Sequence, residues 1–248
     1  HIKKRKTSYS LARRMKALIT GHKGFIGSFL YDHLTYQFGD TIDGLDFPDD
    51  IGDFKTDKIY DIVIHLAAFA AIRDSIDNPD KFWENNVEKS RPIFDYCRDN
   101  NVRLLYASTS QVEEWWQNPY GITKKVNEFM APPNSVGMRF QTVYGENSRP
   151  DMLYRMLEDK TAKYITNHRR DWIHVKDVVR AICYLIPSTY TGTVDVGTGE
   201  TVSVRELAEK FGQGDLPVKT ETPGERDITC ADTTRMRELG WFPTIKIL

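Results

Sequence analysis

The sequence predicts an α/β protein built on a doubly wound parallel sheet, and three observations predict it. A glycine-spaced turn near residue 21 joins a short apolar run to an amphipathic segment, residues 60–68 form a strongly apolar run, and strand-like and helix-like segments alternate along the first half of the chain. Such alternation is typical of parallel sheets covered by helices on both faces. A chain of 248 residues is long enough for one such domain with an added lobe.

The turn follows the apolar run Ala17–Thr20. A strand that reverses at once into a helix needs glycines for the tight turn, and the free N–H groups at the helix start bind a dinucleotide pyrophosphate. Apolar side chains at every fourth position from Ile26 to Leu34 predict the helix. A phosphate-loop NTPase is excluded locally, because no lysine follows the last glycine. A glycine-rich turn without a ligand is the alternative on this segment alone. The expected cofactor contacts here are Gly21, Gly24, Phe25, Ile26 and Gly27.

Composition narrows the range of partners. The formal net charge of -1 gives no basis for binding nucleic acid or an anionic membrane. Cys97, Cys183 and Cys230 form no close pair, so we expect free thiols, no bound metal and a cytoplasmic location. The longest apolar run is shorter than a membrane span requires. Residues 1–14 are rich in lysine and arginine, and we interpret them as a basic tail outside the fold.

A second strand is predicted at residues 40–46, ending in Asp46. In a dinucleotide fold, a carboxylate about 20 residues past the loop binds the adenosine ribose hydroxyls and repels a 2′-phosphate. We therefore expect Asp46 to bind the ribose and NAD to be preferred over NADP. The alternative is that Asp46 only opens the turn that follows it. Asp50 and Ile51 come soon enough afterwards to contact the adenine.

The apolar run at residues 60–68 predicts a strand buried on both faces of the sheet. Its last residues, Leu66, Ala67 and Ala68, are expected to lie against the nicotinamide ribose, because small side chains let the backbone approach a ligand. His65 is interpreted as a hydrogen-bonded core histidine.

The chemistry is predicted to come from the segments that follow. A helix around residues 82–98 precedes a strand at 102–107, which runs into a hydroxyl cluster containing Thr109. Tyr120 and Lys124 are spaced i, i+4 and share a helix face. A neighbouring ammonium and a positive nicotinamide both favour phenolate, so we expect them to lower the pKa of Tyr120 toward the useful range. We predict Thr109, Tyr120 and Lys124 as catalytic residues, the last two also contacting the cofactor.

In these segments the chain resembles the extended short-chain dehydrogenases/reductases of the NAD-dependent nucleotide-sugar epimerase/dehydratase family. The resemblance runs from Met15 to about Pro243. Within the family the chain is most similar to UDP-glucuronate and UDP-glucose 4-epimerases. The segments that carry the resemblance are Gly21–Gly27, His65–Ala68, Ser108–Ser110, Tyr120 with Lys124, Met138–Gly145, Arg149–Met152, Arg170–Asp177 and Asp195–Gly199.

The resemblance implies a Rossmann domain at residues 15–146 and a small C-terminal substrate-binding lobe at 147–248, with a segment of about 170–197 returning to the first domain. It also implies a nucleotide-sugar substrate, a UDP-sugar above all, whose diphosphate needs arginine partners. Arg170 fits that role best, and Arg149 is a candidate for a sugar carboxylate. For each arginine alone, a surface role is the alternative. The predicted substrate contacts are Thr109, Ser110, Thr142, Arg149, Arg170 and Arg226.

Some features depart from the family pattern and predict a trimmed fold. Only a short link joins Asp46 to the strand at Ile62, so one strand-helix unit is reduced, and the loop between Thr109 and Tyr120 is brief. Pro132 ends the Tyr120 helix early. Because the family's dimers commonly use this helix, its early end weakens the expectation of a homodimer.

Two helix starts are predicted in the second half of the chain. Asp177 is expected to begin a helix over residues 178–185, and Ser203 with Glu206 is expected to form a capping box. Both assignments are structural.

We predict from this pattern a 4-epimerase with retained NAD, in which Tyr120 accepts the proton of the sugar 4-hydroxyl. The rival is a 4,6-dehydratase or a decarboxylase. In such relatives an acidic residue follows Thr109 where this chain has Ser110-Gln111, and glutamine cannot exchange a proton. Glu113 or Glu114 could substitute, so this rival stays open. A third alternative is an NAD-binding sensor without turnover.

Overall fold

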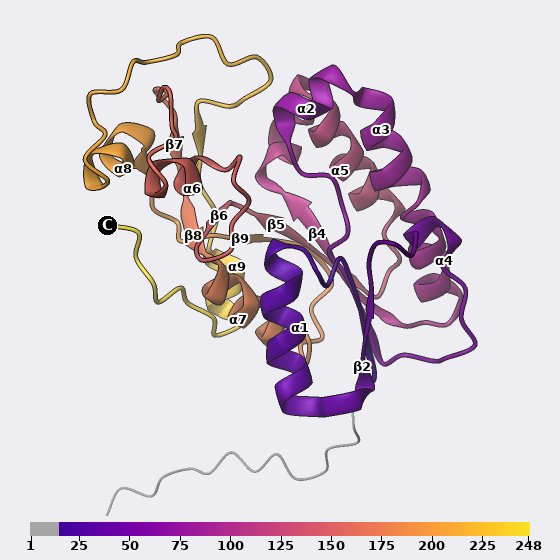
Figure 1. The fold of residues 1–248 in the computed structure, drawn as a ribbon. Helices are drawn as coiled ribbons and strands as arrows, with labels where there is room; N and C mark the ends of the chain where they lie inside the picture. The colour runs from indigo at the N-terminus through magenta and orange to yellow at the C-terminus, as the bar shows by residue number, and fades with distance from the viewer. Residues whose placement is uncertain (1–14) are drawn as a thin grey trace, which may run out of the picture.

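A six-stranded parallel sheet forms the centre of the computed structural model, which describes residues 15–248 (Figure 1). The basic tail at residues 1–14 lies outside the described residues. The strand order is β2-β1-β3-β4-β5-β9, and neighbouring strands run parallel. The chain runs from β1 to β2 at one edge of the sheet and then crosses back to β3 on the opposite side of β1. The direction of winding therefore reverses between β1 and β3. This confirms the doubly wound sheet and places a crevice at the carboxyl ends of β1 and β3. The strand bounds are β1 Ala17–Thr20, β2 Ile42–Leu45, β3 Ile62–His65, β4 Arg103–Thr109, β5 Ser135–Phe140 and β9 Gly192–Val196.

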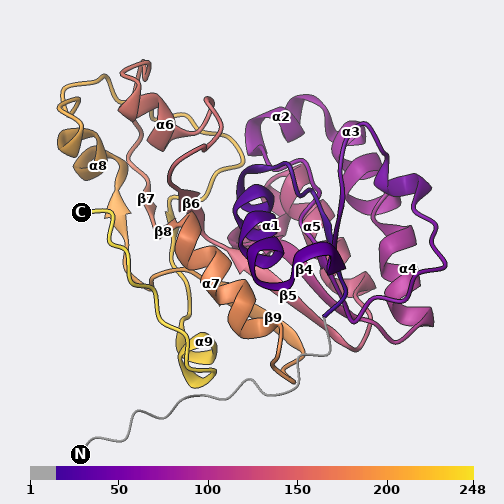
Figure 2. The same cartoon turned by 60° about the horizontal axis from the view of Figure 1, so that its bottom comes forward.

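Helices cover both faces of this sheet (Figure 2). Helices α1 (Phe25–Phe38) and α7 (Val175–Leu185) lie on one face, and α4 (Arg91–Asp99) and α5 (Pro119–Met130) lie on the other. Side chains alternate along β1, since Ala17 and Ile19 belong to the core under α1 and α7 whereas Leu18 packs with α4. A strand buried on both faces has to be apolar throughout, which is why these segments appear as continuous apolar runs.

The connection from β2 to β3 contains only one short 3₁₀ turn, η2 (Ile51–Asp53), and no crossover helix. The predicted reduction of a strand-helix unit is therefore seen in the structure. The predicted helix around residues 82–98 is not continuous, because a π-helical turn at Glu84–Glu88 and Ser90 separate two helical pieces. The remaining elements of the first half are η1 (Gly39–Thr41), α2 (Ile72–Asp77), α3 (Pro79–Trp83), η3 (Glu84–Glu88) and η4 (Ser110–Gln117).

A separate group of short elements, here called the C-terminal lobe, lies beside the carboxyl ends of the strands (Figure 1). It has its own apolar cluster around Trp172, Leu157 and Leu207. The domain boundary at residues 146 and 147 stays a prediction. The elements of the second half are β6 (Thr142–Tyr144), α6 (Leu153–Glu158), β7 (Arg169–Arg170), β8 (Trp172–His174), β10 (Val202–Ser203), α8 (Val204–Lys210), β11 (Ile228–Thr229) and α9 (Thr234–Glu238).

Of the two predicted helix starts, one is correct and one is wrong. Ser203 and Glu206 form the capping box of α8. Asp177 does not begin α7, because the helix starts at Val175 with His174 as its N-cap. Asp177 is instead buried, and its carboxylate accepts hydrogen bonds from the backbone of Thr244 and Ile245 and from Arg180. It therefore fixes the end of the chain to α7.

Candidate active site

The glycine turn after β1 is packed so closely that side chains do not fit at two of its positions. Gly21 has φ +72, and a Cβ there would lie 2.6 Å from the backbone nitrogen of Ala67. A Cβ on Gly27 would lie 1.9 Å from the carbonyl oxygen of Gly21. The start of α1 has Gly24 as its N-cap and no side-chain cap. Free N–H groups in the first helical turn therefore face the crevice, as a cofactor pyrophosphate requires.

Asp46 is held next to this turn at the end of β2. Its carboxylate accepts hydrogen bonds from the backbone N–H of Lys23 at 2.8 Å and of Phe47 at 2.8 Å. Asp50 has a structural role, since it caps η2 through Gly52 and forms an ion pair with Lys89 at 2.7 Å. The ribose contact of Asp46 and the adenine contacts of Asp50 and Ile51 stay predictions.

His65 is a core histidine, as the sequence predicted. Its ring nitrogens lie 2.7 Å from the hydroxyl of Thr20 and 2.9 Å from the hydroxyl of Ser90. Complete burial lowers the pKa of His65 to about 3, and the charge of Lys124 acts in the same direction. A neutral imidazole with both nitrogens engaged takes no part in proton transfer at neutral pH.

Thr109, Tyr120 and Lys124 come together at the ends of β4 and α5. The N-cap Asn118 accepts a hydrogen bond from Gly121, and Pro119 is the first helical residue, so α5 begins directly before the tyrosine. All three predicted catalytic residues are buried and line one cavity. The structure thus brings the predicted catalytic residues together.

The environment of the Tyr120 phenol differs from the expectation. Burial raises the pKa of Tyr120, while a hydrogen bond with the Thr109 hydroxyl and the charge of Arg149 oppose that rise. Burial has the largest effect, so the pKa of Tyr120 in the protein alone lies above its ordinary value and not below it as expected. A phenol held in this way needs a further positive charge beside it to act as a base at neutral pH.

Lys124 is the most deeply buried cation of the site, with a side chain only 2% exposed. Burial lowers its pKa to about 8. No hydrogen bond of its ammonium group is found within residues 15–248. A buried ammonium beside a cavity fits a ligand hydroxyl, such as that of a cofactor ribose.

Replacing Lys124 by methionine is expected to stabilise the protein without NAD at pH 7 while destroying turnover. The difference between 10.5 and about 8 corresponds to a cost of about 3 kcal/mol for keeping this lysine charged when folded. Because the folded pKa is lowered, the cost is complete below pH 8 and fades as pH rises toward 10.5. We expect Lys124→Met to melt about 5–10 °C higher than the wild type at pH 7, with a smaller gain at pH 9.5.

The matched control for this variant is Lys125→Met, which removes the neighbouring charge. The Lys125 side chain is 24% exposed and forms an ion pair with Glu128. We therefore expect no rise in melting temperature when its charge is removed. A Lys124→Met protein that melts below the wild type at pH 7 would contradict the interpretation of a buried, destabilising charge.

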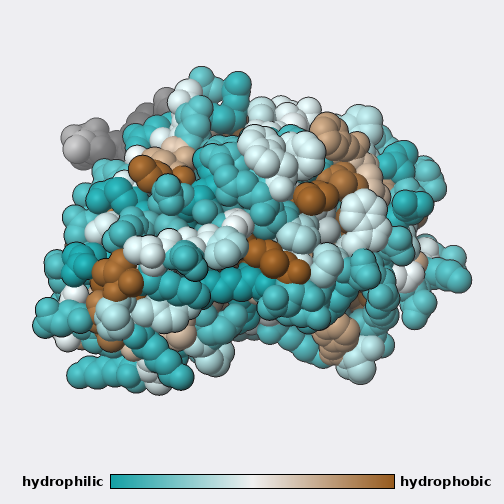
Figure 3. All heavy atoms as spheres, turned by 90° about the horizontal axis from the view of Figure 1, so that it is seen from above, coloured by the Kyte–Doolittle hydropathy of each residue, from teal (hydrophilic) through white to brown (hydrophobic). Residues whose placement is uncertain are grey.

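A cavity of about 870 Å³ joins the glycine turn to these three side chains. Its volume is in the range of small-molecule sites. Seen from the carboxyl ends of the strands, the molecular surface is mainly hydrophilic, with hydrophobic residues in small separate groups (Figure 3). Of the predicted site residues, those that line the cavity are Gly21, Gly24, Phe25, Ile26, Gly27, Leu66, Ala68, Thr109, Ser110, Tyr120, Lys124, Thr142, Arg149 and Arg170. Asp46, Asp50, Ile51, Ala67 and Arg226 lie outside its lining.

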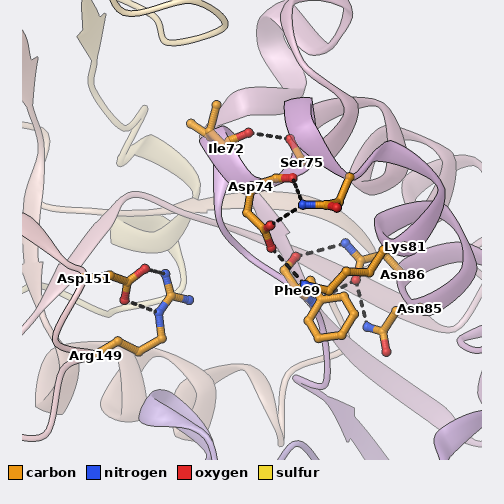
Figure 4. A network of polar contacts seen from close by, with 10 residues as sticks. Phe69, Ile72, Asp74, Ser75, Lys81, Asn85, Asn86, Arg149 and Asp151 are labelled. Atoms are coloured by element: carbon orange, nitrogen blue, oxygen red, sulfur yellow. Dashed lines mark hydrogen bonds and ion pairs between the residues drawn. The ribbon is translucent and has the colours of Figure 1, made fainter.

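The three predicted substrate arginines have different surroundings. Arg149 forms a two-point ion pair with Asp151 on the same loop, across the cavity from α2 and Asp74 (Figure 4). Arg170 is largely buried and lines the cavity. Arg226 does not, because it pairs with Glu113 at 2.7 Å and Glu114 at 3.2 Å. The diphosphate contact of Arg226 stays a prediction, and in the structure its guanidinium is engaged by these two glutamates.

Several cavity residues were missed in the sequence. They share no motif, since they come from α2, the start of η4, the residue after β5 and the C-terminal lobe. The one available signal was position, because residues that directly follow parallel strands meet at the same edge of the sheet. The missed residues are Arg73, Asp74, Gln111, Gln141, Tyr164, His168 and Glu225.

Residues 15–248 contain neither a metal-binding cluster nor a membrane-spanning helix. No group of three or more histidine, cysteine, aspartate or glutamate side chains is placed to hold a metal ion in this part of the chain. None of its helices has the length and apolar character needed to cross a bilayer.

Comparison with known proteins identifies the family. Residues 17–197 match the model of the NAD dependent epimerase/dehydratase family. The protein CapI of Staphylococcus aureus is 31% identical over 232 residues, which cover 69% of this chain and 69% of CapI. A putative UDP-glucose 4-epimerase of Methanocaldococcus jannaschii is 26% identical, over 93% of this chain and 94% of that protein. Dehydratases also occur among the similar proteins.

A solved structure extends the match to the fold. MoeE5 in complex with UDP-glucuronic acid and NAD superimposes with a TM-score of 0.81 at 25% identity, covering 94% of this chain and 95% of that chain. The tight glycine turn and the buried Lys124 fit the same dinucleotide, so the cofactor is NAD. The chain belongs to the NAD-dependent epimerase/dehydratase family of extended short-chain dehydrogenases/reductases, as its motifs predicted.

Proposed function

We propose that the protein is an NAD-dependent epimerase that inverts C4 of a UDP-hexose or UDP-hexuronate through a transient 4-keto sugar. The observation that carries the proposal is the shared cavity, which is lined by the glycine turn, by Thr109, Tyr120 and Lys124, and by Arg170. In this proposal one cavity holds the dinucleotide, the proton acceptor and a cation for the diphosphate.

In this proposal Tyr120 accepts the proton of the 4-hydroxyl while C4 loses its hydrogen as hydride. NAD, held by the glycine turn and Lys124, would supply the hydride acceptor and donor and the positive charge that the buried phenol needs. Thr109 hydrogen-bonds the same sugar oxygen, and Lys124 binds a ribose hydroxyl and stabilises phenolate. Arg170 holds the diphosphate, so the keto sugar can turn and receive the hydride on its opposite face. Binding energy then comes from the nucleotide, away from the reacting carbon.

The carboxylates around the cavity favour epimerisation over elimination. Elimination needs a free acid or base beside the sugar, and the residue two positions after Thr109 is the neutral Gln111. The sequence leaves Glu113 and Glu114 open as the acid or base of a lyase. Both pair with Arg226 and lie outside the cavity lining. Asp74 pairs with Lys81.

The choice between a neutral hexose and a hexuronate depends on Arg149. Its guanidinium is the cation of the cavity wall best placed to bind a sugar carboxylate, but it already has a two-point partner in Asp151 at 2.9 and 3.2 Å. A uronate would have to displace this exposed carboxylate. Both substrates therefore belong in the test.

We expect the NAD-loaded protein to interconvert UDP-glucose with UDP-galactose, or UDP-glucuronate with UDP-galacturonate, when followed by proton NMR. In D2O the product should keep protium at C4, because the same hydrogen leaves and returns. Loss of water or carbon dioxide, or deuterium entering the sugar carbons, would replace the epimerase proposal by the lyase. NAD binding without conversion or transient NADH absorbance with any sugar would favour the sensor.

A further inference from the structure

Residues 224–226 join the C-terminal lobe to the first half of the chain. The side-chain amide of Asn118 donates to the carbonyl of Gly224 at 2.9 Å. Arg226 donates to the carbonyl of Ser110 at 3.0 Å. Between them, Glu225 accepts from Arg73 on α2, a residue 152 positions earlier. The segment 224–226 therefore touches α2, η4 and the N-cap of α5 at once.

The carboxylate of Glu225 lies among three basic side chains on the cavity wall. Its Oε1 is 2.8 Å from Arg73, and its Oε2 is 3.5 Å from Arg170 and 3.4 Å from His168. Glu225 is 14% exposed and Arg170 is 11% exposed, so neither charge is well screened by water. Burial lowers the pKa of His168, which leaves the two arginines as the cations of the group.

Arg73 is oriented by a second contact. Its Nη1 donates to the phenol oxygen of Tyr164 at 2.7 Å. The Nε and Nη2 groups on the other edge of the guanidinium contact the carboxylate of Glu225. Both nitrogens of that edge contact the single carboxylate oxygen Oε1, and one oxygen of a phosphate could take the same place. Arg73, Arg170 and Glu225 all line the cavity, so a diphosphate bound there would compete with Glu225 for the same N–H groups.

We propose that Glu225 is an internal competitor of the substrate diphosphate, which keeps Arg73 and Arg170 in place and lowers the affinity for UDP until phosphate oxygens displace it. This inference rests on the proposed nucleotide-sugar substrate. The negative diphosphate and the carboxylate of Glu225 repel each other where water screens charges poorly. The two therefore cannot both bind the arginines. Glu225 thus sets how tightly the nucleotide is held.

The test measures UDP binding by titration calorimetry, with the protein saturated with NAD so that the glycine turn is filled. Glu225→Gln keeps the shape and removes the charge, and we expect it to bind UDP about tenfold more tightly than the wild type. Glu225→Ala should also gain affinity. The matched control is Glu221→Gln, which removes an exposed carboxylate of the same loop and should leave UDP affinity unchanged within about twofold. Thermal melting checks that each variant is folded.

The outcomes separate this inference from the proposed function. If Glu225→Gln and Glu225→Ala bind UDP as the wild type does or more weakly, Glu225 is a supporting residue and the inference fails, even when sugars are interconverted. If neither wild type nor variants bind UDP, inorganic pyrophosphate is titrated in the same NAD-loaded proteins. Tighter pyrophosphate binding by Glu225→Gln then supports the competitor role while the nucleotide-sugar function fails, and unchanged binding overturns both.

Discussion

Replacing Tyr120 by phenylalanine is expected to lower kcat about 1000-fold while the protein stays folded and still binds NAD. The change removes one oxygen, the proposed acceptor of the substrate proton, and general base catalysis is worth about 100-fold to 10,000-fold. Packing against Phe82, at a centroid distance of 6.4 Å, does not involve that oxygen. The measurement is the rate of sugar interconversion under saturating substrate, alongside NAD titration and thermal melting.

Tyr144→Phe is the matched control for this loss. Tyr144 is buried, and its hydroxyl has no hydrogen-bond partner within the described chain, residues 15–248. Removing that oxygen is therefore expected to leave both turnover and stability nearly unchanged. A Tyr120→Phe protein that keeps more than about a tenth of wild-type kcat would show that the proton goes elsewhere and would remove the basis of the proposed mechanism.

Replacing Gly27 by alanine is expected to weaken NAD binding at least about 100-fold and to lower thermal stability. The added Cβ would lie 1.9 Å from the carbonyl oxygen of Gly21, which is backbone and cannot move without opening the turn. Gly24→Ala provides a graded comparison, because its Cβ would lie 3.2 Å from the same oxygen. A shift of a few tenths of an ångström relieves that contact, so we expect a loss of less than about tenfold.

Ser28→Ala is the control for the glycine series. Ser28 directly follows Gly27, and its hydroxyl donates only to the carbonyl of Phe25 in its own helix. Calorimetric titration with NAD should therefore find this variant close to wild type. Equal NAD affinity in Gly27→Ala and Ser28→Ala would mean that the turn does not form the cofactor site, whatever its geometry.

The parts of the site that could be predicted from sequence are those fixed by local geometry. Gly21 and Gly27 are required by a turn only seven residues long, and Tyr120 and Lys124 share one helix turn. The roles proposed for these residues depend on their neighbours in the chain. His65 was also predictable, since a lone histidine in a buried strand has to find partners within the core.

The parts that could not be predicted depend on contacts between distant segments. Arg226 has the right charge for a diphosphate, but its direction is decided by Glu113 and Glu114, more than a hundred residues earlier. Asp177 has the composition of a helix cap, yet the end of the chain uses its carboxylate instead. The pKa of Tyr120 in the protein alone is raised for the same reason, because distant elements bury the phenol.

The late position of residues 224–226 in the chain also bears on the order in which the site can form during translation. About eighty residues before this segment emerges, the strands β1 to β5 have already left the ribosome and can pair. The side chains proposed for the chemistry have emerged by then as well. At translation rates of about 5–20 residues per second, several seconds separate the emergence of β5 from that of residues 224–226. The contacts of these residues with α2, η4 and the N-cap of α5 are therefore among the last that the proposed nucleotide-sugar site can form.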